Sequence, residues 1–389
     1  MKNLEHIMGG AGPAVLAAGM VCVLLLVCPA QAVSDEDVTP SWDYHAGLDI
    51  CGVGVSADGD FVAAGSGDHH VYFFSEDGGL LWTYVAPLGV NDVAVSERGR
   101  YVAAGTDNNR VYLFNTKGAV IWSYSAGIPV CEVAITDDGG YVAAGTEGGR
   151  VYLFTGEGDL LWSRSAGQSV CGIAIADNAD IVVAGSADRK VYAFDRDGET
   201  LWTYNADFGV CGAAITPDGS TIVAGTQNGR AIVFDRSGEV DWTFSADRSI
   251  CGVDISEDGG LILIGSQDHR TYLLSREGML IWSEALGGEV CDVAISGTGS
   301  LIAAGSTDYT LQVFAVATET AATATPTPTA PPTTAAPTET PAPSNTTAAP
   351  TFPPATNATP MPSPTPSPSS PLMVVAGLGL LLFARHLRR

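Results

Sequence analysis

Residues 93–124 read VAVSERGRYVAAGTDNNRVYLFNTKGAVIWSY, and residues 133–164 read VAITDDGGYVAAGTEGGRVYLFTGEGDLLWSR. The second stretch lies 40 positions after the first, and the two align without an insertion or deletion. The same step separates all seven tryptophans, which are Trp42, Trp82, Trp122, Trp162, Trp202, Trp242 and Trp282. A fixed period of this length predicts one structural unit that is copied along the chain.

Each unit has the pattern of four short strands. In the second unit we expect strands over Val90–Ser96, Tyr101–Thr106, Val111–Asn115 and Ala119–Ser125, divided by turns rich in Gly, Asp and Asn. Short strands with such turns predict a tight antiparallel meander. Four-stranded units of about 40 residues are typical of the blades of a β-propeller.

The number of blades follows from the number of strands. The first three strands of the unit occur seven times, whereas the Trp-containing strand follows only the first six. Trp42, Asp43 and Tyr44 must therefore supply the missing outer strand from the N-terminal side. We predict an all-β, seven-bladed propeller whose last blade takes three strands from one end and one from the other. Such closure removes the exposed sheet edges of an open array.

The two halves of each unit resemble two known repeat families. Val93–Gly105 resembles the first two strands of WD-repeat blades, and Val191–Trp202 resembles the tryptophan-docking motif of quinoprotein (PQQ-like) blades. The resemblance covers roughly residues 40–316 and implies a fold rather than an activity, because these folds host many functions. The sequence has no adjacent Cys-Cys pair and no evident calcium set for a quinone pocket. We therefore expect no PQQ cofactor.

The N-terminal segment predicts secretion. Residues 1–32 combine Lys2, an apolar run over Ala14–Val27 and a small-x-small sequence that ends at Ala32. A positive start, an apolar stretch and such a cleavage sequence are the features of a signal peptide.

The C-terminal segments predict a tether. Residues 317–371 are almost wholly Thr, Pro, Ala and Ser, which favours a disordered, extended stalk. Asn345 and Asn357 begin N-glycosylation sequons, and a bare linker is the alternative. Residues 372–389 combine an apolar run with three arginines, a pattern that resembles the sorting tails of archaeal surface proteins. We expect an extracellular, cell-surface propeller anchored to the cytoplasmic membrane, with this basic end inside.

Charge limits the kinds of partner. Residues 33–371 carry 14 basic and 42 acidic side chains, a net charge of −28. Repulsion between these carboxylates and phosphates argues against nucleic acid as a partner. The charge fits a solubilising surface in saline surroundings, or a surface that attracts cations. We expect the propeller to be a monomer.

One cysteine recurs in six of the seven units, and Asn91 takes its place in the second. A disulfide needs Cα atoms within about 7 Å, whereas packed sheets lie about 10 Å apart. We therefore expect free thiols that pack as small apolar core residues between blades, on the same face as Val53 and Val55. A thiol ring that binds a soft metal is the alternative. The cysteines are Cys51, Cys131, Cys171, Cys211, Cys251 and Cys291.

Two loops vary most among the units: the turn between the second and third strands, and the connection to the next unit. Because strand directions alternate, both loops emerge on one face of the ring, which we call the top face. Variable loops on a rigid scaffold are the expected location of a binding surface. The sequence predicts that the top face binds a protein or a glycan. The candidate binding residues are Leu48, His69, Leu88, Ile128, Gln168, Phe208 and Arg248.

Acidic residues gather on the innermost strands. The residue after the cysteine position is acidic in three units, and a fourth acid stands two residues further along its strand. These side chains are Asp92, Glu132, Asp292 and Asp254. On the face opposite the core they would look into the central channel, where carboxylate oxygens suit Ca²⁺. A channel Ca²⁺ site is one interpretation, and solvated acids are the other.

Other polar residues have simpler interpretations. An Asp/Asn column that includes Asp68 and Asn108 is typical of turn chemistry rather than of a metal site. No Ser/His/Asp constellation is visible, and no pair of carboxylates stands out. We therefore expect a non-catalytic interaction scaffold. The alternatives are a structural propeller that assembles the envelope and a quinoprotein-like or other propeller enzyme.

Overall fold

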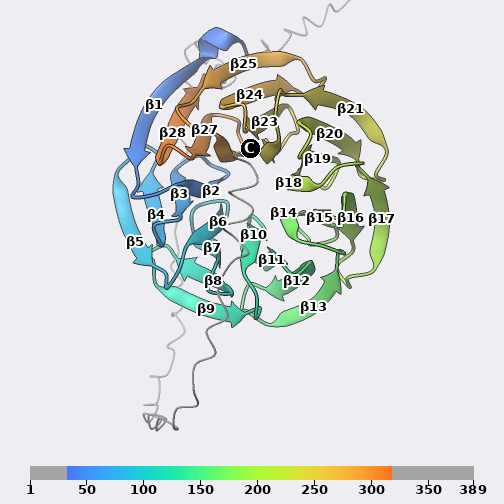
Figure 1. Ribbon diagram of the computed structural model, residues 1–389. Helices are drawn as coiled ribbons and strands as arrows, with labels where there is room; N and C mark the ends of the chain where they lie inside the picture. Colours follow the sequence, from blue (N-terminus) through green and yellow to red (C-terminus); the bar gives the residue numbers. More distant parts are fainter. Residues whose placement is uncertain (1–32, 318–389) are drawn as a thin grey trace, which may run out of the picture. The chain divides into compact units, whose positions relative to one another are not determined.

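The computed structural model describes residues 33–317. The segments predicted to be a signal peptide (1–32), a stalk (317–371) and an anchor (372–389) lie outside these residues, apart from residue 317. The described chain forms seven four-stranded antiparallel sheets that surround a central channel as blades (Figure 1). The predicted all-β, seven-bladed propeller is confirmed.

Each blade runs from an inner strand at the channel to an outer strand at the rim. The blades are β2(Ile50–Val55), β3(Phe61–Ser66), β4(His70–Ser75) and β5(Leu80–Val85); β6(Val90–Val95), β7(Tyr101–Thr106), β8(Arg110–Asn115) and β9(Val120–Ser125); β10(Val130–Ile135), β11(Tyr141–Thr146), β12(Arg150–Thr155) and β13(Leu160–Ser165). They continue as β14(Val170–Ile175), β15(Val182–Ser186), β16(Lys190–Phe194) and β17(Thr200–Asn205); β18(Val210–Ile215), β19(Thr221–Thr226), β20(Arg230–Asp235) and β21(Val240–Ser245); β22(Ile250–Ile255), β23(Leu261–Ser266), β24(Arg270–Ser275) and β25(Leu280–Ala285).

The seventh blade closes the ring as predicted. It is built from β26(Val290–Ile295), β27(Leu301–Ser306), β28(Thr310–Val316) and, as its outer strand, β1(Val38–His45). β1 pairs antiparallel with β28, with Trp42 opposite Val313 and Asp43 opposite Gln312. A short 3-10 turn, η1(Asp35–Asp37), precedes β1. Within residues 33–317 no helix is long and apolar enough to span a bilayer.

The hydrophobic core lies between the blades. One buried cluster joins Ile50, Val62 and Phe74 of the first blade to Leu301 and Val313 of the seventh. Six similar clusters fill the other gaps between neighbouring blades. Each blade therefore depends on both neighbours to bury its two faces, which is the general condition of repeat architectures.

The cysteine position departs from the prediction. In every blade the register between the inner strand and the next strand shifts at this position, as between Ile50 and Gly52. The extra residue forms a β-bulge, which interrupts the alternation of faces. Ile50 and Val53 are 0% and 4% exposed, whereas Cys51 is half-buried. The prediction that the cysteines pack in the core is wrong for this reason, and all six are free thiols in this structure.

The tryptophans fasten neighbouring blades together at the rim. Trp122 on β9 donates a hydrogen bond from Nε1 to the Gly156 carbonyl of the next blade, at 2.9 Å. Its ring lies 5.6 Å from that of Phe154 and against Gly158, which has a φ of +93°. A Cβ on Gly158 would lie 2.8 Å from the Trp122 ring. The turn glycine thus provides both the backbone conformation and the space for the tryptophan.

Trp82 is an exception that allows a matched comparison, because its buried Nε1 has no hydrogen-bond partner. We expect Trp122→Phe to lower the free energy of unfolding by about 1 kcal/mol more than Trp82→Phe, since only the first change breaks a hydrogen bond. Both changes remove similar ring area, so the difference between the two losses of unfolding free energy reports the hydrogen bond alone. Urea denaturation measures it, and equal losses in the two variants would contradict the expectation.

Candidate functional site

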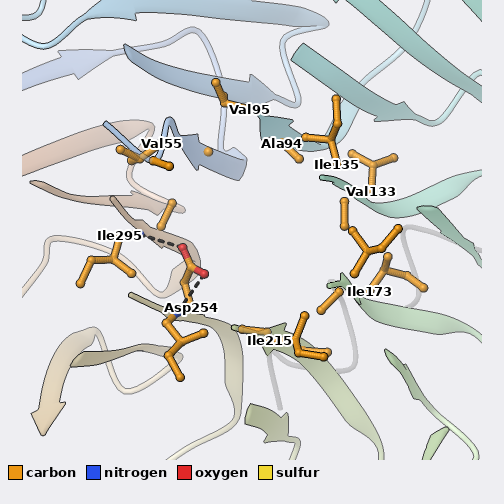
Figure 2. Close-up of a pocket in the computed structure, with 18 of the residues that line it drawn as sticks. Val55, Ala94, Val95, Val133, Ile135, Ile173, Ile215, Asp254 and Ile295 are labelled. Atoms are coloured by element: carbon orange, nitrogen blue, oxygen red, sulfur yellow. Dashed lines mark hydrogen bonds between the residues drawn. The ribbon is translucent and has the colours of Figure 1, made fainter. Parts of the chain in front are cut away.

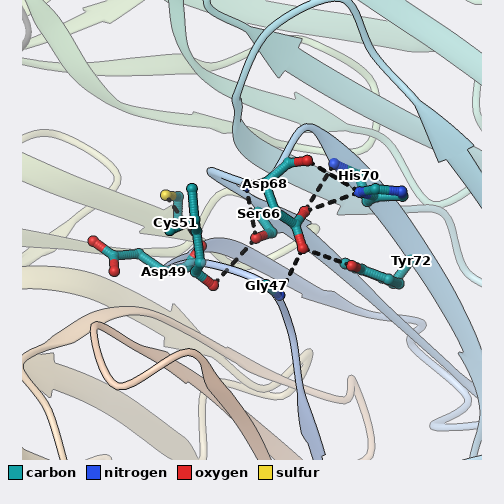
Figure 3. Close-up of polar contacts among 8 residues, drawn as sticks. Gly47, Asp49, Cys51, Ser66, Asp68, His70 and Tyr72 are labelled. Atoms are coloured by element: carbon teal, nitrogen blue, oxygen red, sulfur yellow. Dashed lines mark hydrogen bonds and ion pairs between the residues drawn. The ribbon is translucent and has the colours of Figure 1, made fainter.

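The top face rests on a hydrogen-bond network that repeats around the ring. In the first blade, one carboxylate oxygen of Asp68 accepts from the Gly47 backbone and from the Tyr72 hydroxyl, both at 2.7 Å. Its other oxygen accepts from the His70 backbone at 3.1 Å. Figure 3 shows Asp68 at the centre of these contacts, with Ser66 joining the same network. The carboxylate ties the turn after β3 to the interblade loop.

The same arrangement recurs with small changes. Asp188 accepts from Tyr192 at 2.6 Å, and Asp268 accepts from Tyr272 at 2.8 Å. In the second blade the amide of Asn108 donates to the oxygen of its blade's tyrosine at 2.8 Å. The Asp/Asn column therefore serves the turns, as predicted, and its oxygens are already occupied by protein donors.

Electrostatics favour the ionised form of Asp68. Burial acts to raise its pKa, but hydrogen bonds from Tyr72, Gly47 and His70 outweigh burial and lower the pKa. Burial, together with the bond to this carboxylate, raises the pKa of Tyr72. A carboxylate that is held ionised, with a neutral tyrosine beside it, keeps the loop fixed across the physiological pH range.

Both variable loops emerge on the same face, as predicted. The Ala86 backbone donates to the His69 carbonyl at 2.7 Å, and the Ala46 backbone donates to the Tyr309 carbonyl at 2.9 Å. His69 and Tyr309 occupy the same turn position in their blades, with φ of 79° and 72°. Each interblade connection thus lies beside a turn, and the top face is a continuous ring of loops.

The predicted binding residues differ in exposure. Leu48, Leu88 and Phe208 are 46%, 46% and 49% exposed. Gln168 and Arg248 are also exposed, whereas His69 and Ile128 are half-buried. Sequence reasoning missed Tyr309, which is 42% exposed and adjoins the loop that carries Leu48. Tyr309, Leu48 and Leu88 come from the seventh, first and second blades in turn, and we call these three residues the apolar arc.

The rim carries a second set of exposed apolar side chains that sequence reasoning also missed. They lie at or next to the beginning of the outer strands of several blades. The sequence feature that could have revealed this set is the pair of apolar residues that precedes most of the tryptophans. The exposed members are Leu80, Leu81, Val120, Ile121, Leu160, Leu161, Leu201, Val240, Met279 and Leu280.

The channel encloses a cavity of about 200 Å³, whose lining includes Asp92, Glu132, Asp254 and Asp292. Three of these acids reach across to the next blade. Val133, Ile295 and Val53 donate their backbone N–H groups to Asp92, Asp254 and Asp292 respectively, each at 2.8 Å. Figure 2 shows Asp254 bonded to Ile295 at the edge of the opening. All four acids thus line the channel.

The channel acids share a raised affinity for protons. Burial raises the pKa of Asp92, and the charge of Asp292 adds to the effect. Burial likewise raises the pKa of Glu132, of Asp254 to about 6 and of Asp292 to about 7. Among the described residues, no three His, Cys, Asp or Glu side chains converge to hold a metal ion. The acids surround the channel rather than meeting at one point.

The opposite mouth of the channel holds another acidic group that sequence reasoning did not single out. Asp137, Asp177 and Glu257 line this end of the cavity. The Asp137 backbone donates to the Asp177 carboxylate at 3.2 Å, and the Glu97 backbone donates to the Asp137 carbonyl at 3.0 Å. Burial raises the pKa of Asp137 to about 7, with further contributions from Asp177 and Glu257. The missed signal was the acidic residue after the inner strand in four units.

These carboxylates predict an unusual pH dependence. A carboxyl whose pKa is raised by folding binds more protons in the folded than in the unfolded state, so stability falls as pH rises toward the folded pKa. We expect the free energy of unfolding to be higher at about pH 5 than at about pH 8. Asp137→Asn should flatten this dependence when urea denaturation is measured at both values.

Asp77→Asn is the matched control, because hydrogen bonding with Ser75 lowers the pKa of this exposed carboxyl. This change should leave the slope between the two pH values as it is. A stability that rises with pH, or an Asp137→Asn variant with an unchanged slope, would refute the expectation.

Seven four-stranded sheets around one channel define the class of this protein as a seven-bladed β-propeller. Residues 39–75, 78–115 and 283–314 match the family model of the WD domain, G-beta repeat. Residues 107–256 match the family model of outer membrane protein assembly factor BamB. The BamB model describes PQQ-like repeats. The chain is thus a propeller with WD40 and BamB-like repeats, and the predicted resemblances to WD-repeat and PQQ-like blades are both confirmed. A comparison with curated proteins gave no match.

Proposed function

We propose that the protein is a non-catalytic scaffold outside the cell that binds a protein partner through its top face. The observation that carries this proposal is the apolar arc, in which Tyr309, Leu48 and Leu88 are 42%, 46% and 46% exposed. Large apolar side chains on adjoining loops form a preorganised contact surface, and the Asp68 carboxylate fixes the loop that carries Leu48. Such a surface loses little conformational entropy on binding.

Phe208 extends the proposed surface on the fifth blade, and Arg248 adds a charged group on the sixth. Aromatic residues and arginine are enriched among residues that dominate binding energies. A glycan is the alternative ligand, since exposed aromatic rings also stack on sugars. The cell-surface location and the membrane tether belong to this proposal and rest on residues 1–32 and 317–389.

A role in assembling the cell envelope is the second candidate. The match of residues 107–256 to the assembly factor BamB favours it. In that case the partner would be a neighbouring envelope protein, and the apolar rim offers a further contact surface. The two candidates differ in the partner and in the face that it contacts.

The test is capture of partners from native envelope and culture medium by the tagged full chain, followed by mass spectrometry. We expect a protein that is retained by the native chain and lost by the triple variant Leu48→Ser, Leu88→Ser and Tyr309→Ser. The loss follows because polar side chains remove the apolar contact area.

The matched control is Leu81→Ser, Ile121→Ser and Leu161→Ser, which changes three equally exposed residues on the rim. Retention by both variants would overturn the top-face proposal. A partner lost only with the rim variant would favour envelope assembly through the rim. Binding of the native propeller to a glycan array, lost with the top-face variant, would identify a glycan as the ligand.

Ca²⁺ binding in the channel stays a prediction. Asp92, Asp254 and Asp292 already accept backbone hydrogen bonds, whereas no hydrogen bond or ion pair within residues 33–317 involves the Glu132 side chain. We expect Ca²⁺ to raise the melting temperature, because an ion neutralises crowded carboxylates. Glu132→Gln should abolish the rise, and the exposed control Glu157→Gln should keep it. An unchanged melting temperature with no heat of binding in calorimetry would exclude the site.

A further inference from the structure

Six of the seven blades carry a cysteine at the bulge of the inner strand, and Asn91 occupies that place in the second blade. The blades form a closed ring, and the two cysteines on either side of Asn91 are not neighbours. All six cysteines therefore divide into neighbouring pairs in one way only. The pairs are Cys131 with Cys171, Cys211 with Cys251, and Cys291 with Cys51.

In the first of these pairs both thiols contact a single serine hydroxyl. The Ser169 Oγ lies 3.8 Å from the Cys131 Sγ and 3.3 Å from the Cys171 Sγ. Ser249 occupies the same position two blades further on. Its Oγ lies 3.7 Å from the Cys251 Sγ, and the same hydroxyl acts to lower the pKa of Cys211 against larger effects that raise it. Ser169 thus brings the sulfurs of Cys131 and Cys171 together across the gap between neighbouring blades, and Ser249 stands in the same position in the second pair.

The backbones of neighbouring blades are in contact at this level of the channel. A Cβ placed on Gly212 would lie 2.4 Å from the carbonyl oxygen of Cys251. In the second blade, the Asn91 amide crosses the gap and donates to the Val130 carbonyl at 2.9 Å. The general spacing of about 10 Å between packed sheets, which underlies the expectation of isolated thiols, does not describe this region. Side chains of the cysteine column span the gap.

Hydrogen bonding makes the two pairs asymmetric. The contact with Cys171 raises the pKa of Cys131, and the same contact lowers the pKa of Cys171 to about 7. Cys211 and Cys251 show the same pattern, with the pKa raised for Cys211 and lowered for Cys251. The thiolate is the nucleophile in disulfide exchange. Cys171 and Cys251 also lie nearest the serine hydroxyls, at 3.3 Å and 3.7 Å, where an O–H can donate to a thiolate, and we assign these two as the attacking members.

We propose that Cys131–Cys171 and Cys211–Cys251 are two interblade oxidation sites, each converted to a disulfide by exchange with a low-molecular-weight disulfide such as oxidised glutathione. The Cys171 thiolate attacks one sulfur of the reagent, forms a mixed disulfide and releases one glutathione thiolate. Cys131 then gives up its proton, attacks the Cys171 sulfur and releases the second glutathione. Two protein thiols are oxidised, and one glutathione disulfide is reduced to two glutathione thiols.

The third pair provides an internal contrast. The Cys51 and Cys291 thiols are directed to carbonyls of their own segments, those of Asp49 at 3.7 Å and Glu289 at 3.9 Å. Burial, with the charge of Asp49 contributing, raises the pKa of Cys51 to about 12. No pKa in this pair is lowered, so neither thiol is activated to attack a disulfide. Cys51–Cys291 is therefore the slowest of the three pairs to be oxidised.

The two disulfides would join the blades beside the top face. Ser169 and Ser249 follow Gln168 and Arg248 directly, so each bond would form at the base of an interblade loop. Such a crosslink restricts the unfolded chain and stabilises the folded one. Oxidation therefore stiffens one half of the top-face ring, over the third to sixth blades, and leaves the half that carries the apolar arc unchanged.

The test uses the full chain, reduced and then placed in glutathione buffers of increasing oxidation potential. Free thiols are alkylated at each step, and crosslinked peptides are mapped by mass spectrometry. We expect peptides joining Cys131 to Cys171 and Cys211 to Cys251 to appear before any that join Cys51 to Cys291. The oxidised chain should melt at a higher temperature than the same chain reduced.

Cys131→Ser supplies a further readout, because it leaves Cys171 without its partner. This variant should accumulate a stable glutathione adduct on Cys171, still form the Cys211–Cys251 bond, and gain less melting temperature on oxidation. Glutathione adducts without crosslinks in the unsubstituted chain would overturn the proposal. So would crosslinks distributed equally over all neighbouring cysteines, or an order of formation that begins with Cys51–Cys291.

Discussion

The contact between the inner strands of neighbouring blades is the constraint on which the rest of the structure depends. A Cβ on Gly52 would lie 2.3 Å from the Asp92 Cα, and one on Gly252 would lie 2.7 Å from the Asp292 Cα. Contacts this close leave no room for a side chain at Gly52 or Gly252. They account for the constant length of the repeat, since an inserted residue in any inner strand would displace the next blade. The same contact brings the bulged cysteines of adjacent blades together.

An inner strand that faces a channel has backbone N–H groups that its own sheet does not bond. Buried groups of this kind need a partner. Asp92, Asp254 and Asp292 provide one for Val133, Ile295 and Val53 of the following blades. The cost is that three carboxyls lie in a poorly solvated space, where burial raises the pKa of each. The same buried carboxylates thus attach neighbouring blades to each other and give the channel its raised affinity for protons.

The fold could be predicted almost completely because the sequence pattern that determines it repeats with a fixed period. The 40-residue step, the strand count and the missing outer strand led to β1 as the closing strand without reference to side-chain contacts. The bulge at Cys51 was beyond such reasoning, because an extra residue in one strand leaves no mark in composition. The face assigned to the cysteines was therefore wrong, while that of Asp92 was right. The exposure of Tyr309 and the acidic group at the opposite mouth of the channel could be recognised only from the geometry of the turns.

Nearly identical blades make each departure from the repeat informative. A symmetric ring presents the same surface seven times, so a site that is specific for one orientation of a partner must arise where a column changes. Asn91 interrupts the cysteines, Asp254 replaces a small residue at the channel, and Tyr309 places an aromatic ring in a turn that elsewhere holds polar residues or glycine. Tyr309 lies in the seventh blade, which β1 completes and where the two ends of the propeller meet. Closure of the ring and asymmetry of the top face therefore coincide at the seventh and first blades.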